Sequence, residues 1–509
     1  MPTSPAEPSE LGEPVEPSGL SESSPIPEPS APSTLCAPSA PCDLAVVGAG
    51  PAGLAAAVSA ADLGLSVTLL DAGERPGGQF YRHPAPGLRA ARPEALHHDW
   101  QAFATRATRL EAHRRAGRVT HLASHHVWTV VRDAARGEWL LHAVASGPGG
   151  EEAPALVRAR AVLLATGAYE RQLPFPGWTL PGVVGAGGAQ AMLKAGLVLP
   201  GRRVVVAGSG PLLLAVAASL AAAGAAVPAV VEASSYTSYA TRLPALVRNP
   251  GKLGEGALYG GGLLRHRVRL LTRHAVTAAH GTDRVEAVTV SRLDRDWRPV
   301  PGSERRVPCD ALAVGHGLVP QLELATGLGC ATRRTADDTL ALELDPAQRT
   351  SVPGIWAAGE TGGIGGAQLA LAEGELAAAA IAYELKGVPR PAGTAALVRR
   401  RARLRRFAEA MAVAHRPGDG WTGWLDDATL VCRCEEVPAG RIKEAVAEFG
   451  AKDARTVKLL TRAGMGWCQG RMCGQAVACL AGGGPGEDRR PLSCPVELGQ
   501  LAGLPPSEG

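Results

Sequence analysis

Short apolar runs alternate with longer Ala- and Leu-rich stretches through the middle of the chain. The apolar run 44–47 is followed by a glycine-rich turn, an Ala-rich stretch and a second apolar run at 67–70. Short apolar runs bounded by turn residues are typical of strands buried in a parallel sheet, and the Ala-rich stretch has the length of a helix. The same order recurs between residues 202 and 234. The pattern therefore predicts an α/β fold with two strand–turn–helix–strand units.

The first 41 residues do not follow this pattern. Pro, Ser and Glu dominate residues 1–41, which have too little apolar surface to offset chain entropy and are predicted to be disordered. The segment also lacks the basic start and apolar centre of a secretory signal. The Ala-rich stretches follow glycine turns, which favours buried helices over membrane spans. We therefore expect a cytoplasmic protein with reduced thiols and no integral membrane segment.

The chain is long and nearly neutral. With 509 residues, 46% of them hydrophobic, it should divide into two or three domains. Its net charge of +4 comes from 52 basic and 48 acidic residues, so the composition gives no indication of nucleic-acid binding. No Ser–His–Asp or paired-carboxylate arrangement points to hydrolysis.

The first unit has the sequence of a dinucleotide-binding turn. Gly48, Gly50 and Gly53 form a G-x-G-x-x-G pattern after the first apolar run, and Asp71 ends the second run. This order is that of a Rossmann-like unit, in which the second glycine lets a pyrophosphate approach the helix N-terminus and the acid bonds a ribose. The candidate cofactor-binding residues of this unit are Gly48, Gly50, Pro51, Ala52, Gly53 and Asp71.

The second Rossmann-like unit departs from the first at one position. Gly208 and Gly210 form its turn and Glu232 ends its second strand, but Leu213 stands where the third glycine is expected. A large side chain there pushes the helix outward or fills space that a coenzyme needs. The acid would repel a 2′-phosphate, which favours NADH over NADPH. The alternatives are a site that binds NADH, an empty site in a retained fold, and a site for another adenine nucleotide.

Three later stretches resemble those of two-dinucleotide-domain flavoproteins, the class of glutathione reductase and thioredoxin reductase. The resemblance implies that the first unit binds FAD, that the second is inserted into the FAD domain, and that the segment with Gly78 and Gln79 passes near the isoalloxazine ring. In this class an Asp that bonds the ribityl chain usually stands at the position of Glu360, so this sequence departs there by one methylene. The three stretches are residues 159–177 with Thr166-Gly167, residues 309–321, and residues 352–374 with Gly359-Glu360.

Disulfide reductases of that class keep a pair of reactive cysteines near the flavin. Between Cys42 and Cys309 the sequence has no cysteine. This absence argues strongly against disulfide reduction, so electrons must leave a flavin by another route.

Four of the ten cysteines lie near the C-terminus and supply such a route. Cys432 and Cys434 form a C-x-C pair, and Cys468 and Cys473 follow after a longer spacer. Four thiolates suit zinc or an iron–sulfur cluster. A C-x-C pair is tight for structural zinc, but it can place two sulfurs on one iron of a [2Fe–2S] cluster, with the second pair on the other iron. We therefore predict a [2Fe–2S] cluster on these four residues, with zinc and unliganded thiols as alternatives.

The residues around these cysteines predict a short helical domain. The spacer carries apolar residues at helical spacing. Basic residues would offset the negative charge of a cluster, although the same residues could form an ordinary solvated surface. The apolar residues are Ile442, Ala445, Val446 and Phe449, and the basic candidates are Arg433, Lys458, Arg462 and Arg471.

Two further residues have plainer interpretations. Cys479 lies on an expected helix after the cluster and is predicted to be a core thiol. His316 lies in a glycine turn that a flavin could approach, and a turn residue is a more common outcome there than an acid–base catalyst.

The C-terminal stretch resembles the helical [2Fe–2S] domain of bacterioferritin-associated ferredoxin (BFD). The sequences GMGWCQGRMCG, GSGPLLL and AAGETGGIGGAQLALAEG are similar to those of the larger subunits of bacterial heteromeric dehydrogenases: opine oxidases, hydrogen cyanide synthase, and D-hydroxyproline or proline dehydrogenases. This resemblance covers nearly everything from Cys42 to about Gly484. It implies a smaller partner, a flavoprotein related to D-amino acid oxidase, that takes a hydride from the carbon next to an amine. The present chain would relay electrons.

The expected fold is thus an α/β protein with a small helical domain added. The expected organisation is a disordered tail (1–41), an FAD domain (42–185 and 306–392), an inserted NAD(P)-binding-like domain (186–305), a basic helical linker (393–424), a BFD-like domain (425–485) and a second tail (486–509).

Three functions are compatible with these cofactors. A flavin takes up two electrons and a cluster carries one at a time, so the pair suits conversion between two-electron and one-electron transfer. The chain could be the electron-transfer subunit of a heteromeric amine or imino-acid dehydrogenase of the opine, hydroxyproline, proline or glycine type. It could instead be a self-contained NADH-dependent reductase, or a non-catalytic organising subunit.

Overall fold

The computed structural model describes residues 40–147, 149–484, 486 and 490–502. The segment predicted to be disordered, residues 1–41, lies outside these residues except for its last two. Within the described part of the chain, no helix is both long enough and apolar enough to cross a bilayer.

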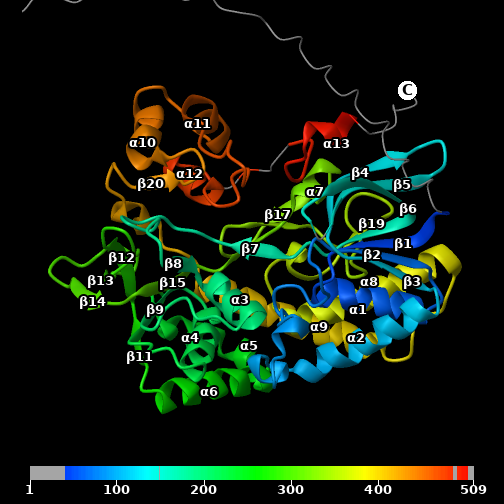
Figure 1. Cartoon of the computed structure of the whole chain (residues 1–509), viewed down its shortest axis with the longest axis horizontal. Coiled ribbons are helices and arrows are strands. Elements are labelled where there is room, and N and C mark those ends of the chain that lie inside the picture. Colours follow the sequence, from blue (N-terminus) through cyan, green and yellow to red (C-terminus); the bar gives the residue numbers. More distant parts are fainter. Residues whose placement is uncertain (1–39, 148, 485, 487–489, 503–509) are drawn as a thin grey trace, which may run out of the picture. The chain divides into compact units, whose positions relative to one another are not determined.

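The first sheet has seven strands in the order β3-β2-β1-β6-β5-β4, with β19 also paired to β6 (Figure 1). Strands β1, β2, β3, β6 and β19 run parallel, and β5 and β4 extend the sheet in antiparallel fashion from the first half of β6. The parallel strands are buried on both faces, as their continuous apolar sequences require. The strands are β1 (Cys42–Val47), β2 (Val67–Leu70), β3 (Val119–Leu122), β4 (His125–Asp133), β5 (Glu138–Ser146), β6 (Glu152–Leu164) and β19 (Ile355–Ala357).

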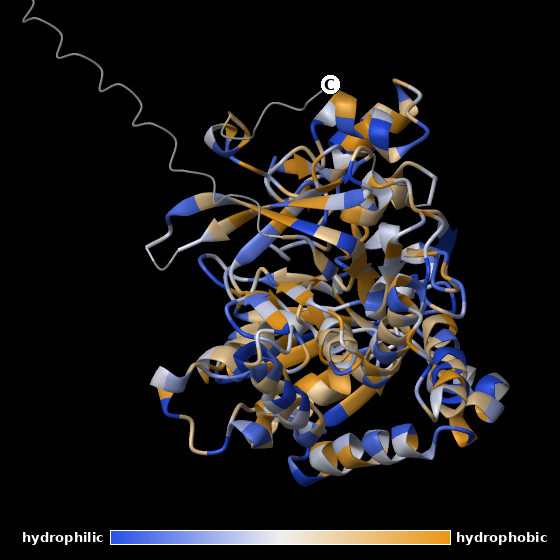
Figure 2. Ribbon diagram, turned by 90° about the vertical axis from the view of Figure 1, so that its right-hand side faces the viewer, coloured by the Kyte–Doolittle hydropathy of each residue, from blue (hydrophilic) through white to orange (hydrophobic). Residues whose placement is uncertain are grey.

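Helices α1, α2 and α8 cover one face of this sheet. A Cβ atom on Gly374 of α8 would lie 2.1 Å from the carbonyl oxygen of Ala52 on α1, so only glycine permits this approach of the two helices. Apolar residues, orange in Figure 2, concentrate on the strands and on the helix faces against them. The helices are α1 (Pro51–Asp62), α2 (Trp100–Arg115), α8 (Ala367–Lys386) and, on the opposite face, α7 (Glu323–Gly327).

The second sheet has five parallel strands in the order β11-β10-β9-β15-β8. Helices α3, α4 and α6 cover one face, and the antiparallel sheet β12-β13-β14 covers the other. The bounds are β8 (Val183–Gly185), α3 (Ala186–Gly196), β9 (Val204–Gly208), α4 (Leu212–Ala222), β10 (Ala229–Glu232), α6 (Pro250–Arg265), β11 (Arg269–Thr272), β12 (His274–His280), β13 (Ala287–Arg292), β14 (Arg305–Pro308) and β15 (Ala311–Gly315).

The inserted unit is longer than the sequence predicted. The expected bounds were 186–305, but β8 and β15 pair with each other, and β15 also pairs with β9. Residues 306–315, expected in the FAD domain, therefore belong to the sheets of the inserted unit. The difference arises because an apolar run identifies a buried strand but carries no information about the strand it pairs with.

The C-terminal domain contains three short helices and a two-stranded ribbon around one core. Ile442 and Ala445 are buried in that core as predicted, whereas Phe449 lies beyond the end of α10 and is 64% exposed. The bounds are β20 (Leu430–Cys432), β21 (Val437–Pro438), α10 (Ala439–Ala447), α11 (Ala454–Thr461), α12 (Gly474–Leu480) and α13 (Leu498–Ala502).

Tryptophan side chains join this domain to the rest of the chain. Trp178 Nε1 donates to the carbonyl oxygen of Leu430 at 2.6 Å, and Trp424 Nε1 donates to that of Trp297 at 3.0 Å. The rings of Trp297 and Trp424 are nearly parallel, with centroids 6.1 Å apart. Each indole thereby buries apolar area and satisfies its only donor at the junction.

Short elements complete the described part. They are η1 (Pro86–Leu88), η2 (Pro93–Leu96), β7 (Ala168–Glu170) paired with β16 (Leu318–Pro320), η3 (Tyr236–Arg242), α5 (Leu243–Val247), β17 (Thr332–Arg334) paired with β18 (Leu340–Leu342), η4 (Gly359–Gly362) and η5 (Asp419–Trp424).

The predicted basic linker forms α9 (Thr394–Ala414), and two of its arginines hold it to α8. Glu373 of α8 is fully buried and accepts hydrogen bonds from Arg401 Nε at 3.1 Å and Arg405 Nη2 at 2.7 Å. The same carboxylate accepts from the backbone N–H of Gly359 at 3.1 Å. A solvated helix was the plainer expectation for these arginines, but this network joins the linker to the Gly359 turn.

Removing one partner of this network should destabilise the protein strongly. Arg405→Met leaves the buried Glu373 with one arginine, and breaking a buried pair in this way costs about 3–5 kcal/mol. The matched control is Arg349→Met, because Arg349 pairs with Glu384 at 2.8 Å at the surface, where a pair contributes about 1 kcal/mol or less. Urea unfolding of the two variants checks this expectation, and equal losses of stability would contradict it.

Candidate cofactor sites

The three glycines of the first turn have different surroundings. A Cβ on Gly48 would lie 2.3 Å from the carbonyl oxygen of Ala165, and one on Gly53 would lie 1.8 Å from that of Gly48. A Cβ on Gly50 would meet nothing within 4 Å. The first and third glycines therefore allow close packing, while the second faces open space at the N-terminus of α1, where a phosphate group can approach backbone N–H groups.

The acid at the end of β2 is tied to the turn. The Asp71 carboxylate accepts hydrogen bonds from the N–H of Ala49 and, at 2.5 Å, from the N–H of Gly73. Pro51 is the first residue of α1, and Ala52 is buried behind it. The helix N-terminus and the carboxylate are thus fixed beside the open face of Gly50.

The Gly77–Gln79 segment lies directly against this turn. A Cβ on Gly78 would be 2.7 Å from the Cα of Gly50, and the N–H of Gly77 donates to the carbonyl oxygen of Ala49 at 2.8 Å. The side chain of Gln79 is exposed and accepts from Arg82 Nη2 at 2.8 Å.

A buried lysine missed by the sequence analysis supports this segment from the inserted unit. Lys194 of α3 is 5% exposed, and its Nζ donates to the carbonyl oxygen of Phe80 at 3.0 Å. Burial lowers the pKa of Lys194 to about 8. Its only sequence signal was one basic residue in an apolar helix.

Thr166 and Gly167 lie on the other side of the first turn. Their segment follows Ala165, whose carbonyl oxygen contacts Gly48 closely. The Thr166 hydroxyl donates to the carbonyl oxygen of Gln321 at 2.8 Å, and the N–H of Gln321 donates to that of Gly167 at 3.0 Å. Gly359 closes the group because its Cβ position lies 2.9 Å from the Cβ of Ala52.

Glu360 is placed differently from the ribityl-binding acid that the resemblance implies. Its carboxylate accepts from the N–H groups of Gly365 at 2.6 Å and Gly366 at 3.0 Å, just before α8 begins. Burial raises the pKa of Glu360, and these two hydrogen bonds oppose that shift. The extra methylene lets the carboxylate reach the N-terminus of α8, which satisfies free backbone donors there.

The second turn is filled by side chains of the chain itself. Glu232 is fully buried and accepts from the N–H groups of Gly210 at 3.0 Å and Ser234 at 2.9 Å. His415, the residue after α9, is also buried, with its Nδ1 3.3 Å from the Ser209 hydroxyl and 3.5 Å from a Glu232 carboxylate oxygen. The opposite ring nitrogen lies 2.5 Å from the Tyr239 hydroxyl. The acid and the turn that would hold an adenosine ribose are therefore occupied by an imidazole.

Leu213 changes the start of the helix after the second turn. In the first unit the N–H of Leu54 bonds the carbonyl oxygen of Gly50, an α-helical bond. In the second, the N–H of Leu213 bonds that of Gly210, a tighter 3₁₀ bond, and α4 begins only at Leu212. The Leu213 side chain is buried in the core of the inserted unit. The expected outward shift is thus seen as a change in the first turn of the helix.

The four cysteines converge on one glycine-rich loop. Cys432 and Cys473 are buried, Cys468 is half-buried and Cys434 is exposed. A Cβ on Gly466 would lie 2.2 Å from the Cβ of Cys434. The N–H of Gly464 points to the Cys432 sulfur at 3.5 Å.

The thiols form two pairs across the motif. A hydrogen bond from the Cys473 thiol lowers the pKa of Cys432 to about 5 and raises the pKa of Cys473. Cys434 is paired in the same way with Cys468. Among the described residues no set of three or more His, Cys, Asp or Glu side chains is arranged around one point as a mononuclear metal site. Two sulfur pairs suit a cluster with two irons better than a single tetrahedral zinc.

The basic candidates near the cysteines make other contacts. Arg462 pairs with Glu435, and Arg471 pairs with Glu323, each at 2.8 Å. Arg433 lies over the ring of Trp178. Lys458 is half-buried on α11.

Arg490, in the C-terminal tail, was not singled out from the sequence. Its guanidinium donates to the carbonyl oxygens of Gly464, at 3.1 Å, and Gln469. This contact brings a positive charge to the cysteine loop from outside the predicted domain.

His316 and Cys479 follow their plainer interpretations. His316 is buried between Trp297 and Trp424, with ring centroids 5.9 Å and 6.1 Å away. Burial, helped by the charge of Arg171, lowers the pKa of His316 to about 3, so the imidazole is neutral near pH 7 and is not poised for acid–base work. Cys479 packs against the C-terminal core, and burial raises its pKa.

Comparison with known families identifies the two parts of the chain. Residues 42–374 match the pyridine nucleotide-disulphide oxidoreductase family, and residues 430–480 match the BFD-like [2Fe-2S] binding domain. The first match covers more than half of the chain, which therefore belongs to the pyridine nucleotide-disulphide oxidoreductase family. It is an FAD-dependent oxidoreductase with a [2Fe–2S] domain, as the sequence predicted.

Individual relatives narrow the similarity. The chain is 35% identical to hydrogen cyanide synthase subunit HcnB of Pseudomonas aeruginosa, over 84% of this chain and 90% of that one. It is 34% identical to an opine oxidase subunit of Agrobacterium tumefaciens, over 91% and 92%. The solved structure of L-proline dehydrogenase from P. horikoshii has a TM-score of 0.60 at 21% identity, covering 91% of this chain and 79% of that one, and supports the fold. The family resemblance inferred from the sequence is confirmed.

Proposed function

We propose that this chain is the electron-transfer subunit of a heteromeric dehydrogenase that oxidises an amine or imino acid of the opine, hydroxyproline, proline or glycine type. The observation that carries the proposal is the combination, on one chain, of an open first dinucleotide turn, a second turn filled by His415, and two pairs of thiols in a small domain. When bound, FAD would supply two-electron chemistry and the cluster one-electron transfer.

The first turn is proposed to hold FAD. Gly50 leaves its backbone open to the pyrophosphate, and Asp71 lies where the adenosine ribose would bind. The remaining contacts are assigned to the segments packed around this turn. The proposed binding residues are Gly48, Gly50, Pro51, Ala52, Gly53, Asp71, Gly78, Gln79, Thr166, Gly167, Gly359 and Glu360.

Cys432, Cys434, Cys468 and Cys473 are proposed to hold the [2Fe–2S] cluster. All nine cysteines in the described part of the chain are free thiols, which supports a reducing compartment such as the cytoplasm. Cys434 is exposed, so the cluster would lie near the surface, where a redox partner can approach.

A smaller flavoprotein related to D-amino acid oxidase is proposed as the partner, and the small-molecule substrate would reach the complex through it. The relatives are named as subunits, which supports an assembly. Affinity purification of the tagged chain from its native cells, followed by mass spectrometry, tests this. A stoichiometric flavoprotein of that kind supports the proposal, whereas a chain recovered alone at native abundance would refute it.

NADH should reduce the isolated chain slowly or not at all. His415 and Tyr239 occupy the turn that the coenzyme would need, and displacing them exposes the buried Glu232. We expect no bleaching of the flavin by about 1 mM NADH, the upper end of common KM values, under anaerobic conditions in which dithionite bleaches it. Rapid reduction at micromolar NADH would favour the self-contained reductase instead.

A further inference from the structure

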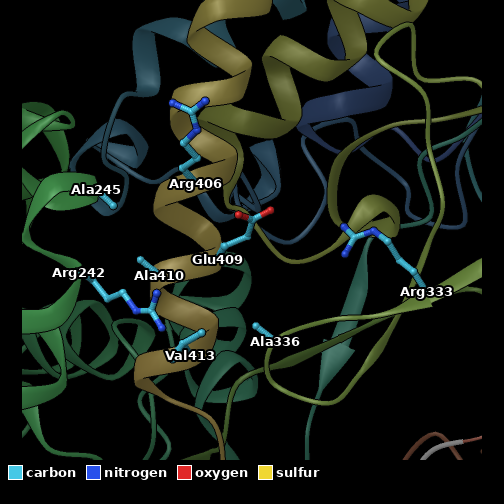
Figure 3. Close-up of a pocket in the computed structure, with 8 residues that line it drawn as sticks. All are labelled: Arg242, Ala245, Arg333, Ala336, Arg406, Glu409, Ala410 and Val413. Atoms are coloured by element: carbon cyan, nitrogen blue, oxygen red, sulfur yellow. The ribbon is translucent and has the colours of Figure 1, made fainter.

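A groove lined by arginines runs between α9 and the η3–α5 segment. It consists of two adjoining hollows with volumes of about 430 and 250 Å³. Both are lined by Arg242, Ala245 and Arg406, so they form one continuous groove. Figure 3 shows guanidinium groups on either side of the larger hollow, carried by segments far apart in the sequence. The charged lining residues are Arg242, Arg248, Arg333, Arg403, Arg406 and Glu409.

The arginines of this groove differ from the others on α9. Arg401 and Arg405 are neutralised by the buried Glu373. In the described part of the chain, no carboxylate lies within ion-pair distance of any of the five groove arginines. Glu409 is the one acid in the lining and pairs with none of them. The groove therefore concentrates positive charge in a protein whose net charge is only +4.

Such an arrangement costs free energy unless an anion binds. Like charges held close together repel, and solvent screens them only in part inside a groove. Guanidinium groups bind phosphate oxygens through paired hydrogen bonds and stay charged at any working pH. The hollow is also large enough for a phosphorylated small molecule.

We propose that this groove binds a small ligand with two or more phosphate groups. The proposal concerns a site other than the filled second dinucleotide turn. The two are nevertheless linked through the chain, because Arg242 ends η3, which carries Tyr239, and the lining residue Val413 lies two positions before His415. The ligand would sit outside the turn, against the two elements that supply its filling, and would not displace His415.

Titration with inorganic triphosphate tests the proposal on the full chain. Isothermal calorimetry at constant ionic strength should show saturable binding of one ligand. Arg242→Ala and Arg406→Ala should each weaken binding about tenfold or more, the loss expected for a charged hydrogen bond. Arg400→Ala removes the same charge from an exposed position of α9 outside the groove and should leave binding unchanged. Circular dichroism of each variant confirms that the fold is retained.

Further ligands define the class. ATP should bind at least as tightly as inorganic triphosphate, and a higher affinity for ATP would identify a nucleotide as the natural form. A poly-glutamate peptide that binds more tightly than either would overturn the proposal in favour of an acidic protein segment. Equal loss of triphosphate binding in Arg400→Ala and Arg406→Ala would show general charge attraction only and would overturn it too. Absence of saturable binding to the wild-type chain would have the same consequence.

Discussion

Replacing Cys432 or Cys473 by serine should strip iron and sulfide from the protein while FAD stays bound. Both thiols are buried and share one hydrogen bond, and both contact the glycine-rich loop at Gly464. Serine has nearly the same shape, so the protein part of the site is retained, but an alkoxide is a far poorer ligand for iron than a thiolate. Since metal binding contributes folding free energy, the C-terminal domain should also become less stable.

The measurement is iron and acid-labile sulfide analysis of protein purified without oxygen. The wild-type chain should contain about two irons and two sulfides, and each serine variant close to none. Cys479→Ser is the matched control, because Cys479 lies in the same domain but belongs to neither thiol pair. Stoichiometric zinc without sulfide in the wild type, or unchanged iron in Cys432→Ser, would refute the assignment of these ligands.

Gly50→Val should give a folded but colourless protein. A side chain at this position enters open space, with nothing within 4 Å of its Cβ, so it should not disturb the packing of α1. It would occupy the space through which a pyrophosphate reaches the helix N-terminus. We expect FAD content to fall by about tenfold or more, equivalent to at least 1.4 kcal/mol. Absorbance of the released flavin measures it.

Gly53→Val provides the contrast. Its Cβ would lie 1.8 Å from the carbonyl oxygen of Gly48, so this variant should lose both flavin and fold. Circular dichroism separates the two outcomes. Normal flavin content in folded Gly50→Val would mean that the first turn is not the flavin site.

The elements of the first turn could be predicted because their chemistry is local. Strand, glycines, helix and Asp71 follow one another within a short stretch, and each residue type has a direct steric or hydrogen-bonding reason. The two pairs of thiols were also visible as a spacing. Even here the sequence could not foresee that Glu360 turns back onto the N-terminus of α8.

The remaining features depend on contacts between distant segments. His415 fills a turn that lies two hundred residues earlier in the chain, and nothing near it in the sequence marks that role. Glu373 sits in an apolar helix where only its partners on α9 explain its burial. The edge of the second sheet was misplaced for the same reason, because β15 chooses its partners through tertiary packing.

An anaerobic reductive titration of the purified chain tests the central claim most directly. The chain should take up about three electrons per molecule, two with bleaching of the flavin and one with the appearance of the EPR signal of a reduced [2Fe–2S] cluster. Loss of the one-electron step in Cys432→Ser should leave the two-electron step intact. Uptake of only two electrons by fully loaded wild-type protein, with no EPR signal, would contradict the account of this chain as a flavin-to-cluster electron relay.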